Sequence, residues 1–102
     1  PGTHVYAVST NTSDVLHVFS VNLANGVLTE QGSPIDIGAG YVTDMEVSMD
    51  GKYLFVADWS SPGLIYGYDI DPITGALTAM TDSPYTTLDW PFSVTTTNVT
   101  LN

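Results

Sequence analysis

The sequence KYLFVADWSSPGLIYGYDIDPITGALTAM, from Lys52 to Met80, decides the fold of this chain. Apolar and polar residues alternate along it, which indicates half-buried strands, and the alternation breaks at Gly or Asp-Pro, which indicates tight turns. The sequence THVYAVSTNTSDVLHVFSVNLANGVLTE, from Thr3 to Glu30, shows the same pattern at an offset of 49 residues. The chain therefore contains an internal repeat, and a repeat of this length is typical of arrays of one recurring structural unit.

Each repeat is predicted to form a meander of short strands. Runs rich in Val, Ile, Tyr, Phe and Thr predict strands at 4–9, 15–22, 27–31, 42–48, 53–58, 64–70, 76–81 and 92–97. The connections contain Gly, Pro, Asn and Asp, so they are short turns that favour antiparallel neighbours. We therefore predict an all-β fold of β-propeller-like blades, each a four-stranded antiparallel meander, in two repeats of about 49 residues.

Length and composition suit one small unit. The 102 residues are 43% hydrophobic and include no cysteine, so neither a disulfide framework nor a thiolate metal site is available. We expect residues 1–102 to form a single two-repeat propeller unit, with repeat 1 at about 3–51 and repeat 2 at about 52–98.

The charge balance is strongly acidic. Eleven Asp and Glu residues face Lys52 alone, for a formal charge of −10, and arginine is absent. Nucleic acids and anionic membrane surfaces are therefore poor partners, because Lys and Arg are what neutralise phosphates. No apolar run is long enough to insert into a membrane. An acidic, solubilising surface of this kind favours an extracellular or cell-surface protein.

The repeats resemble those of a known family. The segment from Asp50 through Thr78 and the segment from His4 through Thr29 are similar to the YVTN-type repeat of lactonase-like β-propellers, with FVAD (Phe55–Asp58) at the place of the Tyr-Val-Thr-Asn strand. The resemblance implies that the chain starts at the second strand of one blade and supplies a complete blade from Val42 to Thr81. It also implies that an innermost strand at Phe92–Thr97 is left alone. Because a closed propeller needs typically four to eight blades, two repeats cannot close one.

An enzymatic role is disfavoured by the residues present. The resemblance to lactonase-like propellers implies anionic substrates, which call for basic residues that this chain lacks apart from Lys52. Neither Gly-x-Ser-x-Gly nor His-Glu-x-x-His occurs. The offset places His4 and His17 at the positions of Tyr53 and Tyr66, which favours packing over acid-base chemistry. We therefore predict that the protein is not an enzyme, that it has no catalytic residues and that it needs no cofactor.

Carboxylates offer the only candidates for a metal site. They are Asp44, Glu46, Asp50, Asp69 and Asp71. Two carboxylates on one face of a strand stand about 7 Å apart and could share Ca²⁺ with backbone carbonyls. We favour turn formation for Asp50 and Asp71 and a solvated position for the others, because no Asp-x-Asp-x-Asp-Gly loop is present.

Two further sets of residues are candidates for modification and binding. Asn11 and Asn98 stand in Asn-x-Ser/Thr sequons, so they are candidate glycosylation sites in an exported protein. Trp59, Trp90 and Tyr85 lie near expected strand ends, where aromatic rings stack on carbohydrate or pack between blades.

The phase of the repeat predicts a structural protein that assembles with copies of itself. The strand at 4–9 lacks a preceding partner and the strand at 92–97 lacks following ones, so each chain holds both halves of one pairing. Exchange between copies would be head-to-tail and would form a ring or a filament. The residues expected to associate are Val5, Tyr6, Val8, Phe92, Val94 and Thr96. The alternatives are a fragment of a longer lactonase-like enzyme and a module that binds carbohydrate or protein.

Overall fold

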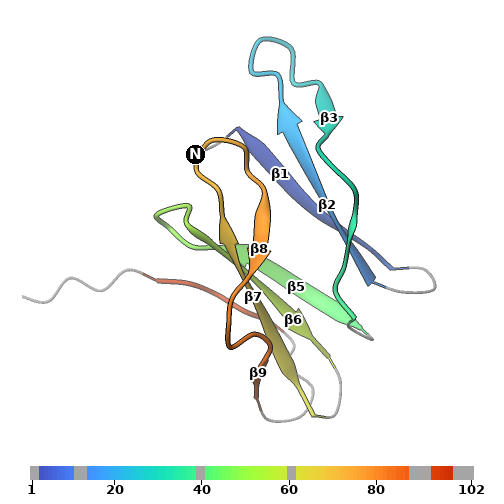
Figure 1. Ribbon diagram of the computed structural model, residues 1–102, viewed down its shortest axis with the longest axis vertical. Helices are drawn as coiled ribbons and strands as arrows, with labels where there is room; N and C mark the ends of the chain where they lie inside the picture. The colour runs from blue at the N-terminus through green and yellow to red at the C-terminus, as the bar shows by residue number, and fades with distance from the viewer. Residues whose placement is uncertain (1–2, 11–13, 39–40, 60–61, 88–92, 98–102) are drawn as a thin grey trace, which may run out of the picture.

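The structure is a computed structural model that describes residues 3–10, 14–38, 41–59, 62–87 and 93–97. These residues form strands and turns without a helix, and the strands make two antiparallel sheets (Figure 1). The strands are β1 (His4–Thr10), β2 (Asp14–Val21), β3 (Leu28–Glu30), β4 (Ile35–Asp36), β5 (Val42–Val47), β6 (Tyr53–Asp58), β7 (Leu64–Ile70), β8 (Leu77–Ala79) and β9 (Tyr85–Thr86). The predicted all-β class and propeller-like blades are confirmed.

The second sheet is a complete blade. Its strands follow the order β5-β6-β7-β8, and β9 pairs with the same strand β7 as β8 does. After β8 the Met80 N–H still donates to the Gly67 carbonyl oxygen at 2.9 Å, and the chain then turns, with the Ser83 N–H donating to the Met80 carbonyl oxygen at 3.0 Å. The Gly67 N–H in turn donates to the Ser83 hydroxyl oxygen at 3.0 Å. The outermost strand is therefore two short pieces, which the alternation pattern did not predict.

The first sheet is the same blade without its innermost strand. Its order is β1-β2-β3, with β4 also on β2, so β1 to β4 correspond to β6 to β9. In the described residues nothing corresponds to β5, and β1 is an edge strand. This is the phase that the sequence repeat predicts.

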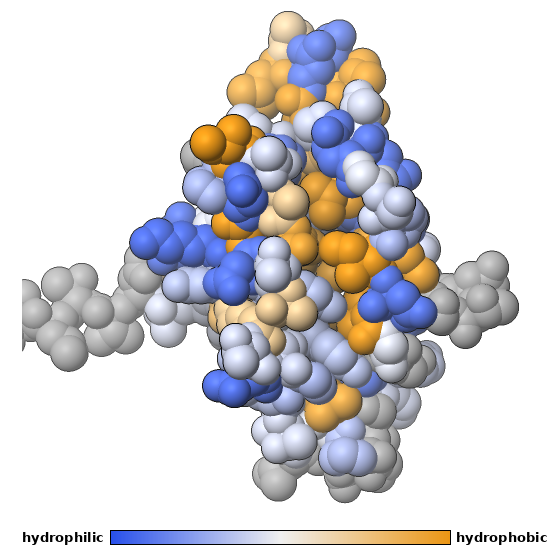
Figure 2. All heavy atoms as spheres, viewed as in Figure 1, coloured by the Kyte–Doolittle hydropathy of each residue, from blue (hydrophilic) through white to orange (hydrophobic). Residues whose placement is uncertain are grey.

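The core lies between the two sheets, because each sheet turns one face of alternating apolar residues toward the other. Leu16 of β2 packs in one cluster with Leu54 and Val56 of β6, and all three side chains are less than 2% exposed. Tyr6 and Val8 pack against the same cluster. In Figure 2 hydrophobic residues run through the middle of the view, along the line where the sheets meet. Burial of apolar area at this contact is the main stabilising term that joins the blades.

The segment predicted as a lone innermost strand differs from expectation. Phe92 lies outside the described residues, and residues 93–97 form no strand. Side chains of β5 bind their backbone instead: Asp44 Oδ2 accepts the Val94 N–H at 3.0 Å, and Glu46 Oε1 accepts the Thr96 N–H at 3.1 Å. The prediction of a strand here is wrong for 93–97, and the reason is physical: a strand needs a ladder partner, and carboxylates take that place.

The described residues include no helix with the length and apolar character needed to cross a membrane.

Candidate functional site

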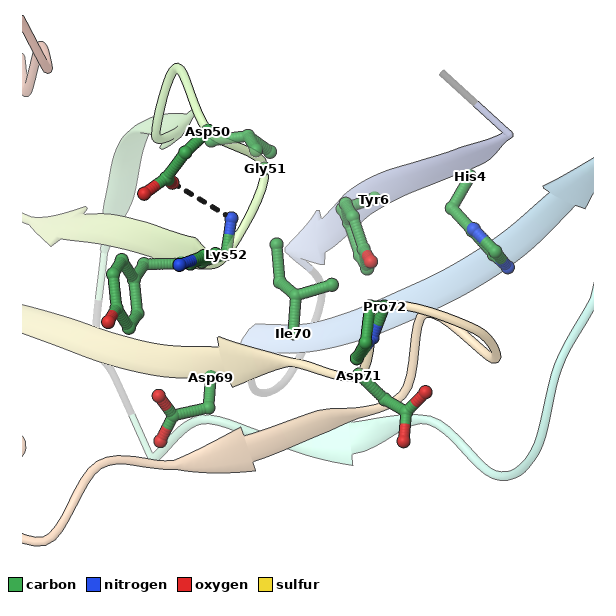
Figure 3. Close-up of a pocket in the computed structure, with 11 residues that line it drawn as sticks. His4, Tyr6, Asp50, Gly51, Lys52, Asp69, Ile70, Asp71 and Pro72 are labelled. Atoms are coloured by element: carbon green, nitrogen blue, oxygen red, sulfur yellow. Dashed lines mark hydrogen bonds between the residues drawn. The ribbon is translucent and has the colours of Figure 1, made fainter. Parts of the chain in front are cut away.

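A hollow of about 660 Å³ opens where β1 of the first blade meets the turns of the second (Figure 3). His4 and Tyr6 reach it from β1, and Lys52 reaches it from the turn between β5 and β6. Asp69 and Asp71 line it from the end of β7. The hollow is therefore a feature of the contact between blades.

Two side chains of β1 fasten the first blade to the turn after β7. The Tyr6 hydroxyl donates to the Gly75 carbonyl oxygen at 2.8 Å, and burial raises the pKa of that phenol. The His4 ring lies so close over Gly75 that a Cβ there would collide with it. Thr3 Oγ1 and His4 Nδ1 are 3.0 Å apart. The structure thus places His4 in a packing contact with the second blade.

Asp50 and Asp71 organise the turns at the rim of the hollow. Asp50 Oδ1 accepts the Ser48 hydroxyl at 2.6 Å and the Lys52 N–H at 3.1 Å, the latter drawn in Figure 3. The hydrogen bond from Ser48 is the main cause that lowers the pKa of Asp50. The pKa of Asp71 is lowered chiefly by the backbone N–H of Thr74 and then by that of Ile73. Both carboxylates therefore act on the backbone as anions.

These two lowered pKa values predict acid sensitivity. A carboxylate with a lower pKa in the folded state stabilises the fold fully above its unfolded pKa, here 3.8, and loses that contribution as the pH falls through the folded value. We expect the temperature of the thermal unfolding midpoint, followed by circular dichroism, to decrease as the pH drops below 3.8. The decrease should be smaller in Asp50→Asn. The matched variant Asp69→Asn, which spares both turns, should keep the dependence of the parent chain. Equal acid dependence in Asp50→Asn and the parent would contradict this role.

The two acids of β5 have a different task. Besides the Thr96 N–H, Glu46 Oε1 accepts the Thr96 hydroxyl at 3.3 Å, while Asp44 holds Val94. Both carboxylates stand on the side of β5 that faces the segment 93–97. Within the described part of the chain, no three His, Asp or Glu side chains gather as a metal site. The structure thus uses Asp44 and Glu46 to bind backbone groups.

Two buried acids, which the sequence pattern did not indicate, bind the backbone of the segment that leads from the first blade into β5. Asp14 is 4% exposed and its Oδ2 accepts the Val42 N–H at 2.8 Å. Asp58 is 2% exposed and its Oδ1 accepts the Tyr41 N–H at 3.0 Å. These carboxylates fix the entry into β5 from both sides. Their signal in the sequence is an Asp at a strand end beside a turn.

A chain of three polar side chains crosses the far face of the first sheet. Ser9 Oγ lies 3.0 Å from His17 Nε2, and His17 Nδ1 lies 2.7 Å from Glu30 Oε2. The spacing is that of a nucleophile, a base and an acid. The repeat places Asp58 and Tyr66 at the positions of Ser9 and His17, and those residues lie on the face of the second sheet that contacts the first. We therefore interpret the three residues as a hydrogen-bonded network of a blade-packing face.

The other residues named in the sequence analysis are the aromatic residues, the residues expected to associate and the sequon residues. Some make contacts in the structure and some lie outside the described residues. Trp59 makes an edge contact with Tyr41, with ring centroids 5.4 Å apart, and the Tyr85 hydroxyl donates to Met80 Sδ at 3.6 Å. The predicted associating residues Tyr6 and Val8 already contact the second blade of the same chain, whereas Val5 is 37% exposed. Asn11, Asn98, Phe92 and Trp90 lie outside the described residues.

Comparison with solved structures shows which known proteins share this fold. The chain is similar to a putative 6-phosphogluconolactonase from Bacteroides fragilis, with a TM-score of 0.77 and 27% identity over 90% of this chain and 24% of that one. It is equally similar to a putative 6-phosphogluconolactonase from Bacteroides uniformis, with a TM-score of 0.77 and 27% identity over 89% of this chain and 25% of that one. The chain spans about a quarter of the length of either structure. No protein-family model and no curated protein sequence matches it.

These structures correct one prediction and bear out part of another. The lactonase-like likeness is confirmed at the level of fold, while the YVTN assignment of the repeats stays a prediction. The expectation that the protein is not an enzyme is contradicted, because the similar structures bear the name of an enzyme. The expectation was drawn from the absence of arginine and of two sequence motifs, and such absences do not exclude other catalytic groups.

Proposed function

We propose that this chain forms two consecutive blades of a longer lactonase-like β-propeller that hydrolyses a sugar lactone. The observation that carries the proposal is the match of nearly the whole chain to a quarter of two solved structures named for that activity. The edge strand β1 supports it, because among the described residues β1 has no inner partner like the one that β5 gives to β6.

The residues of this chain favour a scaffolding part in that reaction. Lactone hydrolysis needs a base for the attacking water and donors for the developing oxyanion, and a phosphorylated substrate also needs cations. Lys52 is the only Lys or Arg of the chain, and it shares its hollow with carboxylates, which repel an anionic ligand. The cationic groups of the proposed enzyme therefore come from other blades.

In the proposed enzyme, this chain contributes the spacing between neighbouring innermost strands. Asp44 and Glu46 hold the segment 93–97 against β5, so they fix the spacing between one inner strand and the next. An error of about 1 Å in the position of reacting groups can lower a rate roughly 100-fold. We assign Glu46 as a positioning residue in the proposed enzyme.

The test uses the native polypeptide, isolated with an antibody raised against this chain. We expect a mass several times the 10.9 kDa of the 102 residues and hydrolysis of 6-phosphogluconolactone faster than its spontaneous opening. Gluconolactone without the phosphate serves as the comparison substrate. A native polypeptide of 10.9 kDa that opens neither lactone would refute the proposal.

A pair of matched variants tests the positioning role of Glu46. Glu46→Gln weakens the acceptor for Thr96, so we expect kcat to fall about 10-fold or more. Asp82→Asn, at an exposed position between β8 and β9, should leave kcat near that of the parent. Equal kcat in both variants would exclude a positioning role for Glu46.

A further inference from the structure

We propose that Tyr41 and Trp59 form an aromatic platform on which the uncharged ring of a sugar stacks. The choice of a sugar as the ligand rests on the proposed lactonase function, whereas the location of the aromatic platform rests on the contacts of this chain. Binding of a sugar ring needs no catalytic group, so binding and hydrolysis can be tested separately.

The aromatic platform lies where the innermost strand of the complete blade begins. Tyr41 directly precedes β5, and Trp59 directly follows β6, the strand that pairs with β5. This end of the blade is opposite the β5–β6 turn, which borders the hollow (Figure 1). Innermost strands of a propeller surround its central channel. In the proposed enzyme the aromatic platform therefore stands at one mouth of that channel, where ligand sites with aromatic linings are common.

Both rings keep a large exposed area although they contact each other. Their centroids are 5.4 Å apart in an edge contact, yet the Tyr41 side chain is 60% exposed and the Trp59 side chain is 39% exposed. The first blade covers Leu54 and Val56 on the face of the second sheet and still leaves Tyr41 in solvent. The reason is that Tyr41 lies at the end of the sheet and not on its face. Its exposure therefore does not result from a missing preceding blade.

Buried carboxylates hold the backbone under the aromatic platform. Asp58 Oδ1 accepts the Tyr41 N–H at 3.0 Å, and the Trp59 N–H donates to the Tyr41 carbonyl oxygen at 2.7 Å. Asp14 of the first blade accepts the next N–H, that of Val42, at 2.8 Å. Both blades thus fix the same short segment. A site that is ordered before its ligand arrives loses less conformational entropy on binding, which favours affinity.

An extra residue interrupts the pairing of β5 and β6 beside the aromatic platform. Val42 pairs with Asp58, whereas Asp44 pairs with Ala57, so the register shifts at Thr43. Bulges of this kind are common next to active sites, where they redirect side chains. The other repeat has Thr10 at the position of Trp59. A tryptophan here is therefore no requirement of the repeated fold.

The charges around the aromatic platform favour an uncharged part of the ligand. Lys52, the only Lys or Arg of the chain, lies at the opposite end of β6, and the nearest buried charged groups are the carboxylates of Asp14 and Asp58. Carboxylates repel a phosphate, whereas the C–H face of a sugar ring packs on an aromatic ring without needing a cation. The ring of the sugar is therefore the part that this site takes.

The experiment measures binding of methyl glucoside to the native polypeptide by titration calorimetry. This probe has a closed sugar ring and no lactone carbonyl, so it binds without reacting. We expect Tyr41→Ala and Trp59→Ala each to raise the Kd about 10-fold, whereas Tyr41→Phe, which keeps the ring, should stay within about twofold of the parent. Ile73→Ala, at an 86% exposed position in the β7–β8 turn, is the control for loss of an exposed apolar side chain and should bind like the parent.

The outcomes separate this inference from the proposed function. A parent polypeptide that does not bind methyl glucoside, or an unchanged Kd in both alanine variants, would overturn the aromatic platform even if the parent hydrolyses 6-phosphogluconolactone. Binding that depends on both rings in a polypeptide that opens neither lactone would support the aromatic platform and refute the proposed function.

A second measurement needs no substitution and so does not depend on the folding of a variant. In nuclear magnetic resonance spectra of the parent with methyl glucoside, we expect Overhauser effects between the C–H protons of the sugar and the ring protons of Tyr41 and Trp59. Binding without these effects would locate the sugar elsewhere and contradict the inference.

Discussion

Leu16→Ala is expected to lower the free energy of unfolding by about 2–5 kcal/mol, which is a large part of the stability of a small domain. Leu16 is 0% exposed and packs between the sheets with Leu54 and Val56. The substitution removes buried apolar atoms and leaves a cavity at the contact between blades, which neither sheet can close alone. Urea unfolding followed by circular dichroism measures the change.

Leu23→Ala is the matched control for this substitution. Leu23 is 73% exposed, in the turn between β2 and β3, so the same loss of atoms should change the free energy of unfolding by less than about 0.5 kcal/mol. If Leu16→Ala and Leu23→Ala gave equal small losses, the blades would not share one core.

The alternation of residue types was enough to predict the long strands. β1, β2, β6 and β7 each bury one face against the other sheet, so their period of two is complete and agrees with the 49-residue repeat. The short strands β4 and β9 were not predicted, because two residues carry no period. Their pairing depends on β2 and β7 extending beyond β3 and β8.

The candidate site depended on contacts that no local pattern contains. Glu46 and Thr96 lie 50 residues apart in the sequence, so spacing along β5 indicated only a pair of carboxylates and not their ligands. The His17 position was read as packing, but its network with Ser9 and Glu30 needed the register of three strands. The acidic balance indicated that nucleic acids and anionic membranes are poor partners, and that exclusion stays a prediction. Extracellular location and a carbohydrate or protein ligand stay predictions.

Gly75→Ala is expected to destabilise the chain more than Gly26→Ala, and the difference isolates the contact between blades. Both glycines have positive φ, so alanine at either position costs about 1–2 kcal/mol of backbone strain. At Gly26 the new methyl group meets open space, whereas at Gly75 it meets the His4 ring. The ring must move, and the hydrogen bond from Tyr6 to the Gly75 carbonyl moves with the turn.

The measurement that separates these effects is a double-mutant cycle of Gly75→Ala with His4→Ala, using free energies of unfolding in urea. Removal of the ring should relieve the collision, so the cost of Gly75→Ala should fall toward that of Gly26→Ala when His4 is absent. Gly26→Ala combined with His4→Ala should be additive, because nothing within 4 Å links that position to the ring. Additivity in the Gly75 cycle as well would mean that His4 does not fasten the first blade to the second, since a shared contact between two residues must appear as a coupling energy.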